Sequence, residues 1–406
     1  MICAILCIGC APNVSSLNRH LEKGAYDLAL EEARNDPAMI AHLAALILER
    51  EATEHSDRAA VMINYLAGSG KPGKYALKRL AQSTGVASRL AGIALGRSSL
   101  PSDRELDSYL SDSWSDVRVA AARTWSRKID RKRLEEMILD PDPGVRVEAA
   151  AGLGRFEGEK TAGILAQTAR LDPDPRVRAR AVTQVKSLGV DALDVCRNAL
   201  DDDNMGVRNA ALRGLSDLGS DAAVELIRDR MAGPMTEVTV VAAAELARLD
   251  HKDGKGRFRE ALKNRRSNIR ATALVHLDRA RVENPDKIRL GMLDDDDPSV
   301  VLTAAAALLT GADDSRGPVS RALRRIVEEG SMRAPRARDM LAVVGEPAAV
   351  AEVQEVLEQG DEEEIVTSLK RVARAAMLYD NFVSLLKDDR AGVRIEAARS
   401  VLQNRQ

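Results

Sequence analysis

Apolar residues recur along this chain with the spacing of one helix face, and the most complete copy of the pattern spans residues 140–154. Val145, Ala149 and Leu153 fall at i, i+4 and i+8, which places them on one side of an α-helix. An Asp-Pro pair precedes the apolar run, as is typical of a helix N-terminus. We therefore predict a short amphipathic helix here, with Gly154 providing a left-handed stop.

The same helix pattern returns about every 31 residues along most of the chain. The residues equivalent to Val145, here called anchor residues, are Val86, Val117, Val145, Val177, Val207, Val238, Ile269, Val300, Met332, Ile365 and Val393. Eight of these eleven units carry alanine four residues after the anchor, and a second amphipathic segment fits between successive anchors, as at Thr161–Leu171. Each unit is thus expected to be a helical hairpin that buries its apolar face only by stacking on its neighbours.

Arginine directly follows the anchor in seven of the eleven units, where it would lie near the positive end of the helix dipole. The turn before it is acidic in several units, so we predict charge-assisted hydrogen bonds between neighbouring repeats. The main members of this structural ladder are predicted to be Asp142, Arg146, Asp174, Arg178, Arg208, Arg270 and Arg394. The units anchored at Val86, Val238, Val300 and Ile365 lack the arginine, so the ladder is expected to be interrupted there.

The pattern Leu-Asp-Pro-Asp-Pro-x-Val-Arg, followed by Ala and Leu and closed by Leu-Gly, resembles the HEAT repeat, in the short form common in bacterial HEAT-like and PBS-lyase-like proteins. The resemblance covers about five-sixths of the chain. It implies an all-α fold, a right-handed α-solenoid of about ten stacked HEAT-like hairpins with an N-terminal helical cap. In that family the Asp and Arg positions are structural, while functions range from scaffolds to lyases and nucleic-acid enzymes.

The N-terminal part of the chain is helical in pattern but less regular. Residues 11–70 contain a segment that looks like one tetratricopeptide hairpin, and we interpret them as a cap that closes the repeat stack. Turn-forming residues at Gly68–Gly73 mark the expected boundary, so residues 71–406 are predicted to form the solenoid.

The first ten residues are almost wholly apolar and hold three of the four cysteines. They match a signal-peptide core in length, and the stretch around Cys10 resembles a bacterial lipobox, which would make residues 1–10 an anchor segment lipidated at Cys10. No Lys or Arg precedes the run, and Cys7 stands where the lipobox usually has leucine. The alternative is a first helix whose cysteines serve as small hydrophobic residues.

Composition gives no sign of catalysis. The net charge is −2, which exerts no general attraction on nucleic acid or anionic membrane. None of the five histidines is followed by glutamate, so the paired His-Glu ligands of HEAT-like iron hydroxylases are absent, and no Ser/His/Asp or Cys/His grouping is visible. We predict no catalytic residue, no metal and no cofactor.

Two stretches are strongly basic, at residues 255–281 and 316–338. They lie about two repeats apart, so in a solenoid they could form one basic stripe, although solvated helix faces with local ion pairs would give the same composition. The candidate partner-binding residues are Lys255, Arg257, Arg259, Lys263, Arg265, Arg266, Arg321, Arg324 and Arg325. An acidic protein segment fits such a stripe better than nucleic acid, because only Phe258 is available there for base stacking.

The sequence therefore predicts a non-catalytic protein-binding scaffold tethered to a bacterial envelope membrane through Cys10, with no other contact to the membrane. The alternative is a cytoplasmic HEAT-like enzyme or enzyme regulator, either lyase-like or nucleic-acid-binding.

Overall fold

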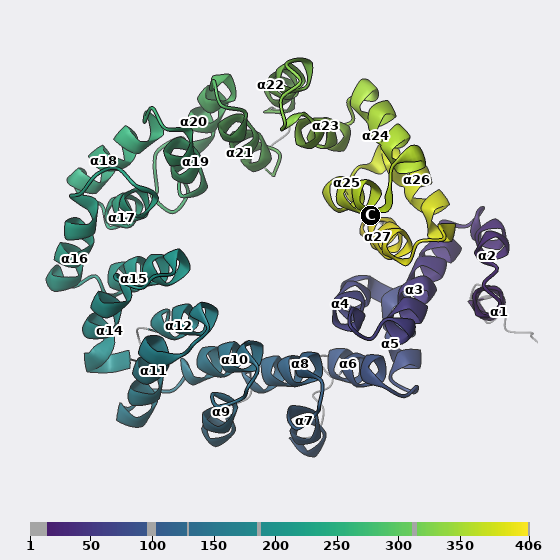
Figure 1. Cartoon of the computed structure of the whole chain (residues 1–406), viewed down its shortest axis with the longest axis horizontal. Coiled ribbons are helices and arrows are strands. Elements are labelled where there is room, and N and C mark those ends of the chain that lie inside the picture. Colours follow the sequence, from purple (N-terminus) through teal and green to yellow (C-terminus); the bar gives the residue numbers. More distant parts are fainter. Residues whose placement is uncertain (1–13, 96–102, 128–129, 185–187, 311–314, 405–406) are drawn as a thin grey trace, which may run out of the picture. The chain divides into compact units, whose positions relative to one another are not determined.

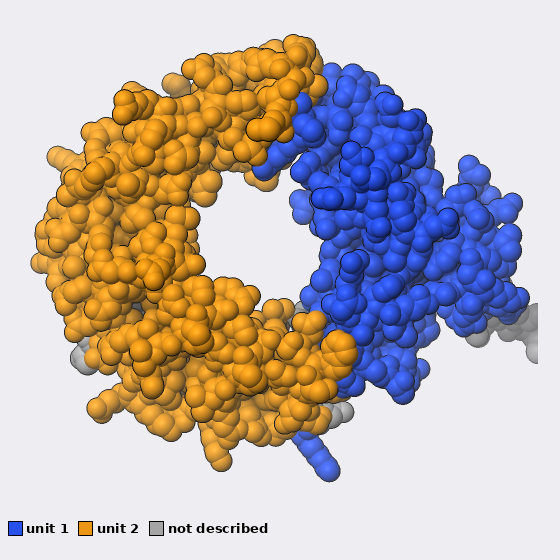
Figure 2. Space-filling view, in the orientation of Figure 1, with its two compact units in different colours: residues 1–105, 334–406 blue, residues 106–333 orange. Residues whose placement is uncertain are grey.

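The computed structural model describes residues 14–95, 103–127, 130–184, 188–310 and 315–404, and every regular element within these ranges is a helix. The chain divides into two compact units (Figure 2). Unit 1 combines residues 1–105 with residues 334–406, and unit 2 comprises residues 106–333. The predicted anchor segment, including Cys10, lies outside the described residues.

Unit 2 is built from short helices that alternate between two layers (Figure 1). Its helices are α7 (Asp103–Leu110), α8 (Ser115–Trp125), α9 (Arg131–Met137), α10 (Pro143–Leu153), α11 (Glu159–Leu171), α12 (Pro175–Val182), η1 (Gly189–Asp191), α14 (Ala192–Ala199), α15 (Met205–Leu218), α16 (Asp221–Met231), α17 (Glu237–Arg248), α18 (Lys252–Leu262), α19 (Ser267–Val275), α20 (Pro285–Gly291), η2 (Met292–Asp294), α21 (Pro298–Leu308) and α22 (Arg316–Glu328).

The anchor helices of unit 2 pack on one another in chain order, from α8 through α10, α12, α15, α17 and α19 to α21. From α10 onward, each also packs against the helix that precedes it, so the repeating element is a hairpin. Val145, Ala149 and Leu153 are fully buried, as are Ala181 and Ala211 at the equivalent alanine position. The predicted all-α architecture of stacked helical hairpins is confirmed.

The end of α10 differs from the expectation. Gly154 has φ −60°, so it does not supply a left-handed stop. A Cβ atom at Gly154 would come within 1.8 Å of Gln184 Oε1, a side chain of the next repeat. A larger residue here would therefore require the Gln184 side chain to move, and the backbone conformation itself does not demand glycine.

Unit 1 holds helices from both ends of the chain. They are α1 (Val14–Glu22), α2 (Tyr26–Ala33), α3 (Pro37–Glu54), α4 (Ala59–Gly68), α5 (Gly70–Leu80), α6 (Val86–Leu95), α23 (Ala334–Val343), α24 (Pro347–Gln359), α25 (Glu362–Val372), η4 (Ala376–Leu378), α26 (Tyr379–Ser384), η5 (Leu385–Lys387) and α27 (Ala391–Gln403).

Within unit 1, the last helix of the chain packs against the long third helix as well as against its own neighbours α25 and α26. The N-terminal segment thus covers the C-terminal end of the repeats. Residue 70, the predicted domain boundary, is the first residue of α5 inside unit 1, and the compact units do not divide there.

One predicted anchor residue is wrong. Met332 is 99% exposed and precedes α23, whose buried face carries Ala337 and Leu341. Pro335 lies in the first turn of that helix, where its missing N–H and fixed φ are favourable. The helix therefore starts later than the regular period suggests, and Ala337 takes the place assigned to Met332.

Candidate functional site

The arginine after the anchor links successive repeats of unit 2. Arg146 binds both carboxylate oxygens of Asp172 at 2.8 Å, and Arg178 binds those of Asp202 at 2.8 and 2.9 Å. The remaining nitrogen, Nη1, donates to a carbonyl of the arginine's own turn, as from Arg178 to the Asp172 oxygen at 2.9 Å. Each guanidinium therefore joins the turn of its own repeat to the turn of the next one.

The acidic members of the ladder need a correction, because Asp142 and Asp174 do not bind the ladder arginines. Asp142 accepts a hydrogen bond from the Gly144 N–H, and Asp174 from the Arg176 N–H, so both cap the following helix. The arginines bind the aspartate two residues earlier, as Arg146 does at Asp172. The Arg178 guanidinium holds the pKa of the Asp202 carboxyl below its usual range.

The ladder stops where the following turn lacks an aspartate. Arg208 donates to the Asp202 and Asp203 carbonyls, and within the described residues its side chain has no carboxylate bound to it. In the next repeat Thr239 replaces arginine, and its hydroxyl donates to the Pro234 carbonyl at 2.8 Å. The contacts resume at Arg270, which binds the Asp295 carboxylate at 2.6 and 2.7 Å.

The ladder arginine of the last repeat finds its partner in unit 1. Arg394 Nη1 donates to the Asp388 and Asp389 carbonyls, as the other ladder arginines do in their own turns. Its Nε and Nη2 contact Glu51 Oε1 at 2.7 and 2.6 Å, and its guanidinium lies 4.8 Å from the centre of the Tyr26 ring. Glu51, from α3, thus occupies the place that the aspartate of a following repeat would take.

The predicted partner-binding residues lie outside this ladder. Several already have partners. Lys255 pairs with Asp250 and Arg257 pairs with Glu260, while Arg325 donates to the Leu293 carbonyl at 2.9 Å. These local contacts agree with the alternative that the basic stretches are solvated helix faces with local ion pairs.

Four of the predicted cations differ from the rest. They form what we call the α18–α19 cluster, at the end of α18 and in the turn to α19: Arg259, Lys263, Arg265 and Arg266. All four are exposed, and the described residues offer no carboxylate within ion-pair distance of them. Phe258 is fully buried, so this surface presents no aromatic ring for base stacking from that position.

Part of the charge in the second basic stretch is already engaged within the chain. Arg321 is exposed in α22 of unit 2, whereas Arg324 already takes part in an interaction within the chain. Arg325 also lies 4.0 Å from Asp294, so part of its charge is neutralised. The stretch continues across the division between the units at residue 334, and the predicted single stripe stays a prediction.

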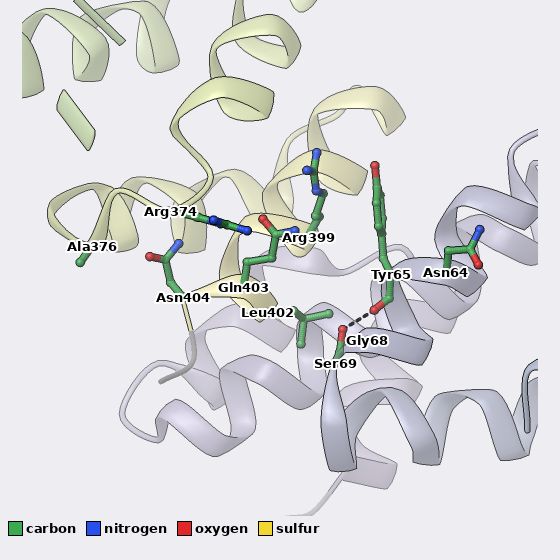
Figure 3. Close-up of a pocket in the computed structure, with 10 residues that line it drawn as sticks. All are labelled: Asn64, Tyr65, Gly68, Ser69, Arg374, Ala376, Arg399, Leu402, Gln403 and Asn404. Atoms are coloured by element: carbon green, nitrogen blue, oxygen red, sulfur yellow. Dashed lines mark hydrogen bonds between the residues drawn. The ribbon is translucent and has the colours of Figure 1, made fainter. Parts of the chain in front are cut away.

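A polar pocket of about 850 Å³ lies in unit 1, between helices from the two ends of the chain. Figure 3 shows Tyr65 and Ser69 from the end of α4 on one side, with Arg374, Arg399 and Gln403 on the other. Sequence reasoning missed this pocket, because its lining is brought together only by the packing of α27 against the N-terminal helices.

Arg399 is held in place at the edge of that pocket. Its Nη1 contacts Glu396 at 3.0 Å, and its guanidinium lies 5.0 Å from the centre of the Tyr65 ring. Burial, followed by the charge of Glu396, raises the pKa of the Tyr65 hydroxyl. The hydroxyl lies 3.4 Å from a Glu396 oxygen, to which it can donate.

The described residues offer little for catalysis. One group could hold a metal by proximity, formed by Glu51, Glu54 and His55, but Glu51 already binds Arg394. Cys196 is buried, and desolvation raises the pKa of its thiol to about 12, so it is not a nucleophile near neutral pH. No described helix has both the length and the apolar character needed to cross a bilayer.

Comparison with known proteins places the repeats in a known class. Residues 104–186 and 162–235 match the family model for HEAT repeats. The matched region is less than half of the chain, and it lies within the stack that carries the continuous part of the arginine ladder. No curated protein matches the chain in sequence.

Solved structures that resemble the chain include the E. coli protein YibA, with 16% identity and a TM-score of 0.32, over 72% of this chain and 99% of that one. An engineered protein has 16% identity and a TM-score of 0.30, over 81% and 98%. A Kap121p mutant has 12% identity and a TM-score of 0.37, over 94% of this chain and 48% of that one. These low scores leave the function to be argued from the chain itself.

Proposed function

We propose that this protein is a non-catalytic HEAT-repeat scaffold that binds a protein partner through an acidic segment of that partner. The α18–α19 cluster is the binding surface. A stack of HEAT hairpins supplies a rigid support, and the helices on both sides of the turn are anchored by buried Phe258 and Ile269.

One observation carries the proposal. In the same basic stretch, Lys255, Arg257 and Arg270 are each paired with a carboxylate of the chain, whereas the four cations of the cluster are not paired within the described residues. The four unpaired cationic groups, at the end of α18 and in the turn that follows, repel one another, and an acidic partner would remove that repulsion. Such a surface acts mainly on the rate of association.

The test uses a fluorescein-labelled peptide of sixteen Glu and Asp residues and fluorescence anisotropy at low salt. Arg265→Glu with Arg266→Glu should weaken binding at least tenfold, because two attractive contacts become repulsive. Raising the salt concentration to 0.5 M should have the same effect on the parent, because screening weakens exposed charge pairs. The matched control is Arg155→Glu with Arg180→Glu, two exposed arginines of unit 2 that leave the net charge the same as in the test variant.

Equal affinity in the test and control variants would show that the cluster is not the binding surface. Tighter binding of single-stranded DNA than of the peptide would favour the nucleic-acid class instead. With Phe258 buried, we expect the opposite order.

We further propose that Cys10 carries a lipid that tethers the scaffold to a bacterial cell envelope. The support for this is the lipobox-like sequence that ends at Cys10. Labelled palmitate should be incorporated by the parent and not by Cys10→Ala. Incorporation that persists in that variant would place the lipid on another residue and overturn the assignment to Cys10. No incorporation by the parent, or its recovery only in the cytoplasmic fraction, would favour the cytoplasmic enzyme or regulator.

A further inference from the structure

We infer that the pocket of unit 1 binds a small phosphorylated polar molecule, such as a sugar phosphate. The inference is independent of the proposed scaffold function, because the α18–α19 cluster belongs to unit 2. It rests on the charge of the pocket, on the hydrogen-bonding groups in its lining and on its size.

The lining of the pocket is positively charged. Two arginines line the pocket, and no Asp or Glu is among its lining residues. Glu396 compensates Arg399, which leaves Arg374 as the uncompensated cation. Arg374 is exposed in the segment after α25, and no described carboxylate pairs with it.

The Arg399 side chain is already held in position in the pocket. Its guanidinium is fixed by Glu396 and by the ring of Tyr65, so little side-chain freedom remains to be lost when a ligand binds. Its Nε is buried and has no hydrogen-bond partner in the described structure. Because Nε is buried, a ligand in the pocket would contact the terminal nitrogens of this guanidinium instead.

Guanidinium groups bind phosphate through charge-assisted hydrogen bonds of defined geometry, so Arg374 and Arg399 define the anionic end of the ligand. Figure 3 shows the Arg374 side chain extending toward Gln403, on the side of the pocket where Arg399 lies. The phosphate group would therefore lie near these two arginines.

The rest of the lining determines the body of the ligand. Asn64 and Gln403 carry amides that can donate and accept hydrogen bonds, whereas Leu402 and Ala376 are the only aliphatic side chains of the lining. A volume of about 850 Å³ is much larger than a phosphate ion requires, and it falls in the range of about 300–1,000 Å³ typical of ligand pockets. A polyhydroxylated body fits this lining better than an apolar one.

Isothermal titration calorimetry on the full chain tests the inference with three probes that share one body. Glucose 6-phosphate should bind with saturation, glucose should not bind, and glucuronate, which carries a carboxylate at the same position, should bind more weakly than the phosphate. Arg374→Gln should weaken binding of glucose 6-phosphate about tenfold or more, since it removes a charge-assisted contact. Because Arg374 is exposed and pairs with no described residue, this variant should keep the thermal midpoint of the parent.

The matched control is Arg155→Gln, which removes another exposed cation, from unit 2 and outside the α18–α19 cluster, and should leave binding of the sugar phosphate unchanged. Arg399→Lys keeps the charge but loses the planar fork, so it should also bind more weakly than the parent. No saturable binding of glucose 6-phosphate to the parent would overturn the inference. Equal losses in Arg374→Gln and Arg155→Gln would overturn it as well. Tighter binding of glucuronate than of glucose 6-phosphate would mean that the pocket selects a carboxylate rather than a phosphate.

Discussion

The ladder arginine makes its carboxylate contact in two settings, between neighbouring repeats and between the two ends of the chain. In unit 2, Arg146 and Asp172 are separated by 26 residues, and Arg178 and Asp202 by 24. In unit 1, Arg394 and Glu51 are separated by 343 residues. The last repeat thus has the same arginine as the other repeats of the ladder, although no further repeat follows it. The N-terminal segment provides the carboxylate that this arginine binds, even though its sequence does not follow the repeat pattern.

The two contacts differ in burial. The Glu51 side chain is fully buried and that of Arg394 is 10% exposed, whereas Asp202 and Arg178 are 12% and 17% exposed. Only one Glu51 oxygen is bound by Arg394, and the other lies 3.4 Å from His55. A more desolvated pair contributes little net stability when intact but is costly to break, because the remaining charge stays buried.

The largest effect is therefore expected from Glu51→Ala, which leaves Arg394 without its carboxylate. We expect a loss of about 3–5 kcal/mol in the free energy of unfolding of unit 1. Both tryptophans lie in unit 2, and Trp125 is buried there, so circular dichroism reports on the whole chain and tryptophan fluorescence on unit 2 alone. In urea, the variant should unfold partly at lower concentration by circular dichroism, with little change in fluorescence.

Glu54→Ala is the control for this experiment. It removes the same side chain one turn later in α3, where the carboxylate is 46% exposed and pairs with Arg50. We expect less than about 1 kcal/mol from this exposed pair. If both variants unfold alike, the contact between Arg394 and Glu51 does not hold the two ends of the chain together.

A second experiment compares complete and incomplete contacts within unit 2. Arg178→Ala should cost about 1–3 kcal/mol, because it removes a bidentate ion pair, two carbonyl contacts and the packing of the side-chain stem. Arg208→Ala should cost about 0.5–1.5 kcal/mol, because Arg208 bonds only to carbonyls. Urea unfolding monitored by tryptophan fluorescence measures both.

The order of these two values is the informative result. If Arg208→Ala lowers the free energy of unfolding as much as Arg178→Ala does, the carboxylate contact adds no stability. The carbonyl contacts would then account for the stabilising effect of these arginines. If Arg178→Ala unfolds like the parent but loses a bound partner, the ladder arginines are functional rather than structural.

The repeats were predictable because each is fixed by residues close in sequence. The anchor valines, the alanines four residues later and the arginines all recur within one period, and a periodic pattern of this kind determines local structure. The choice between Asp172 and Asp174 was not predictable from residue type, because both are aspartates in one turn. The second lies at the N-cap, where its oxygen satisfies a backbone N–H, so the first is left to bind arginine.

The junction and its pocket could not be predicted from the sequence. Glu51 lies in a helix of irregular pattern, and no spacing rule connects it to Arg394. The pocket then depends on that packing, since Tyr65 and Arg399 belong to opposite ends of the chain. The sequence gives the number of charges in the basic stretches, but it does not show which of them are paired. Arg257 forms an ion pair and Arg259 forms none within the described residues.

The smallest expected effect concerns pH. Arg178 lowers the pKa of Asp202 in the folded protein below the ordinary value of 3.8. A lowered folded-state pKa adds stability above pH 3.8, and this contribution is lost as the pH falls through the folded-state value. For this partly exposed pair, we expect Asp202 to account for about 0.5–1 kcal/mol of the decrease in the unfolding free energy of unit 2 between pH 5 and pH 3. Tryptophan fluorescence measures that decrease. Asp202→Asn should reduce that decrease, whereas the exposed neighbour Asp203→Asn should not, and identical pH profiles for the two variants would show that the ladder carboxylate does not sense acid.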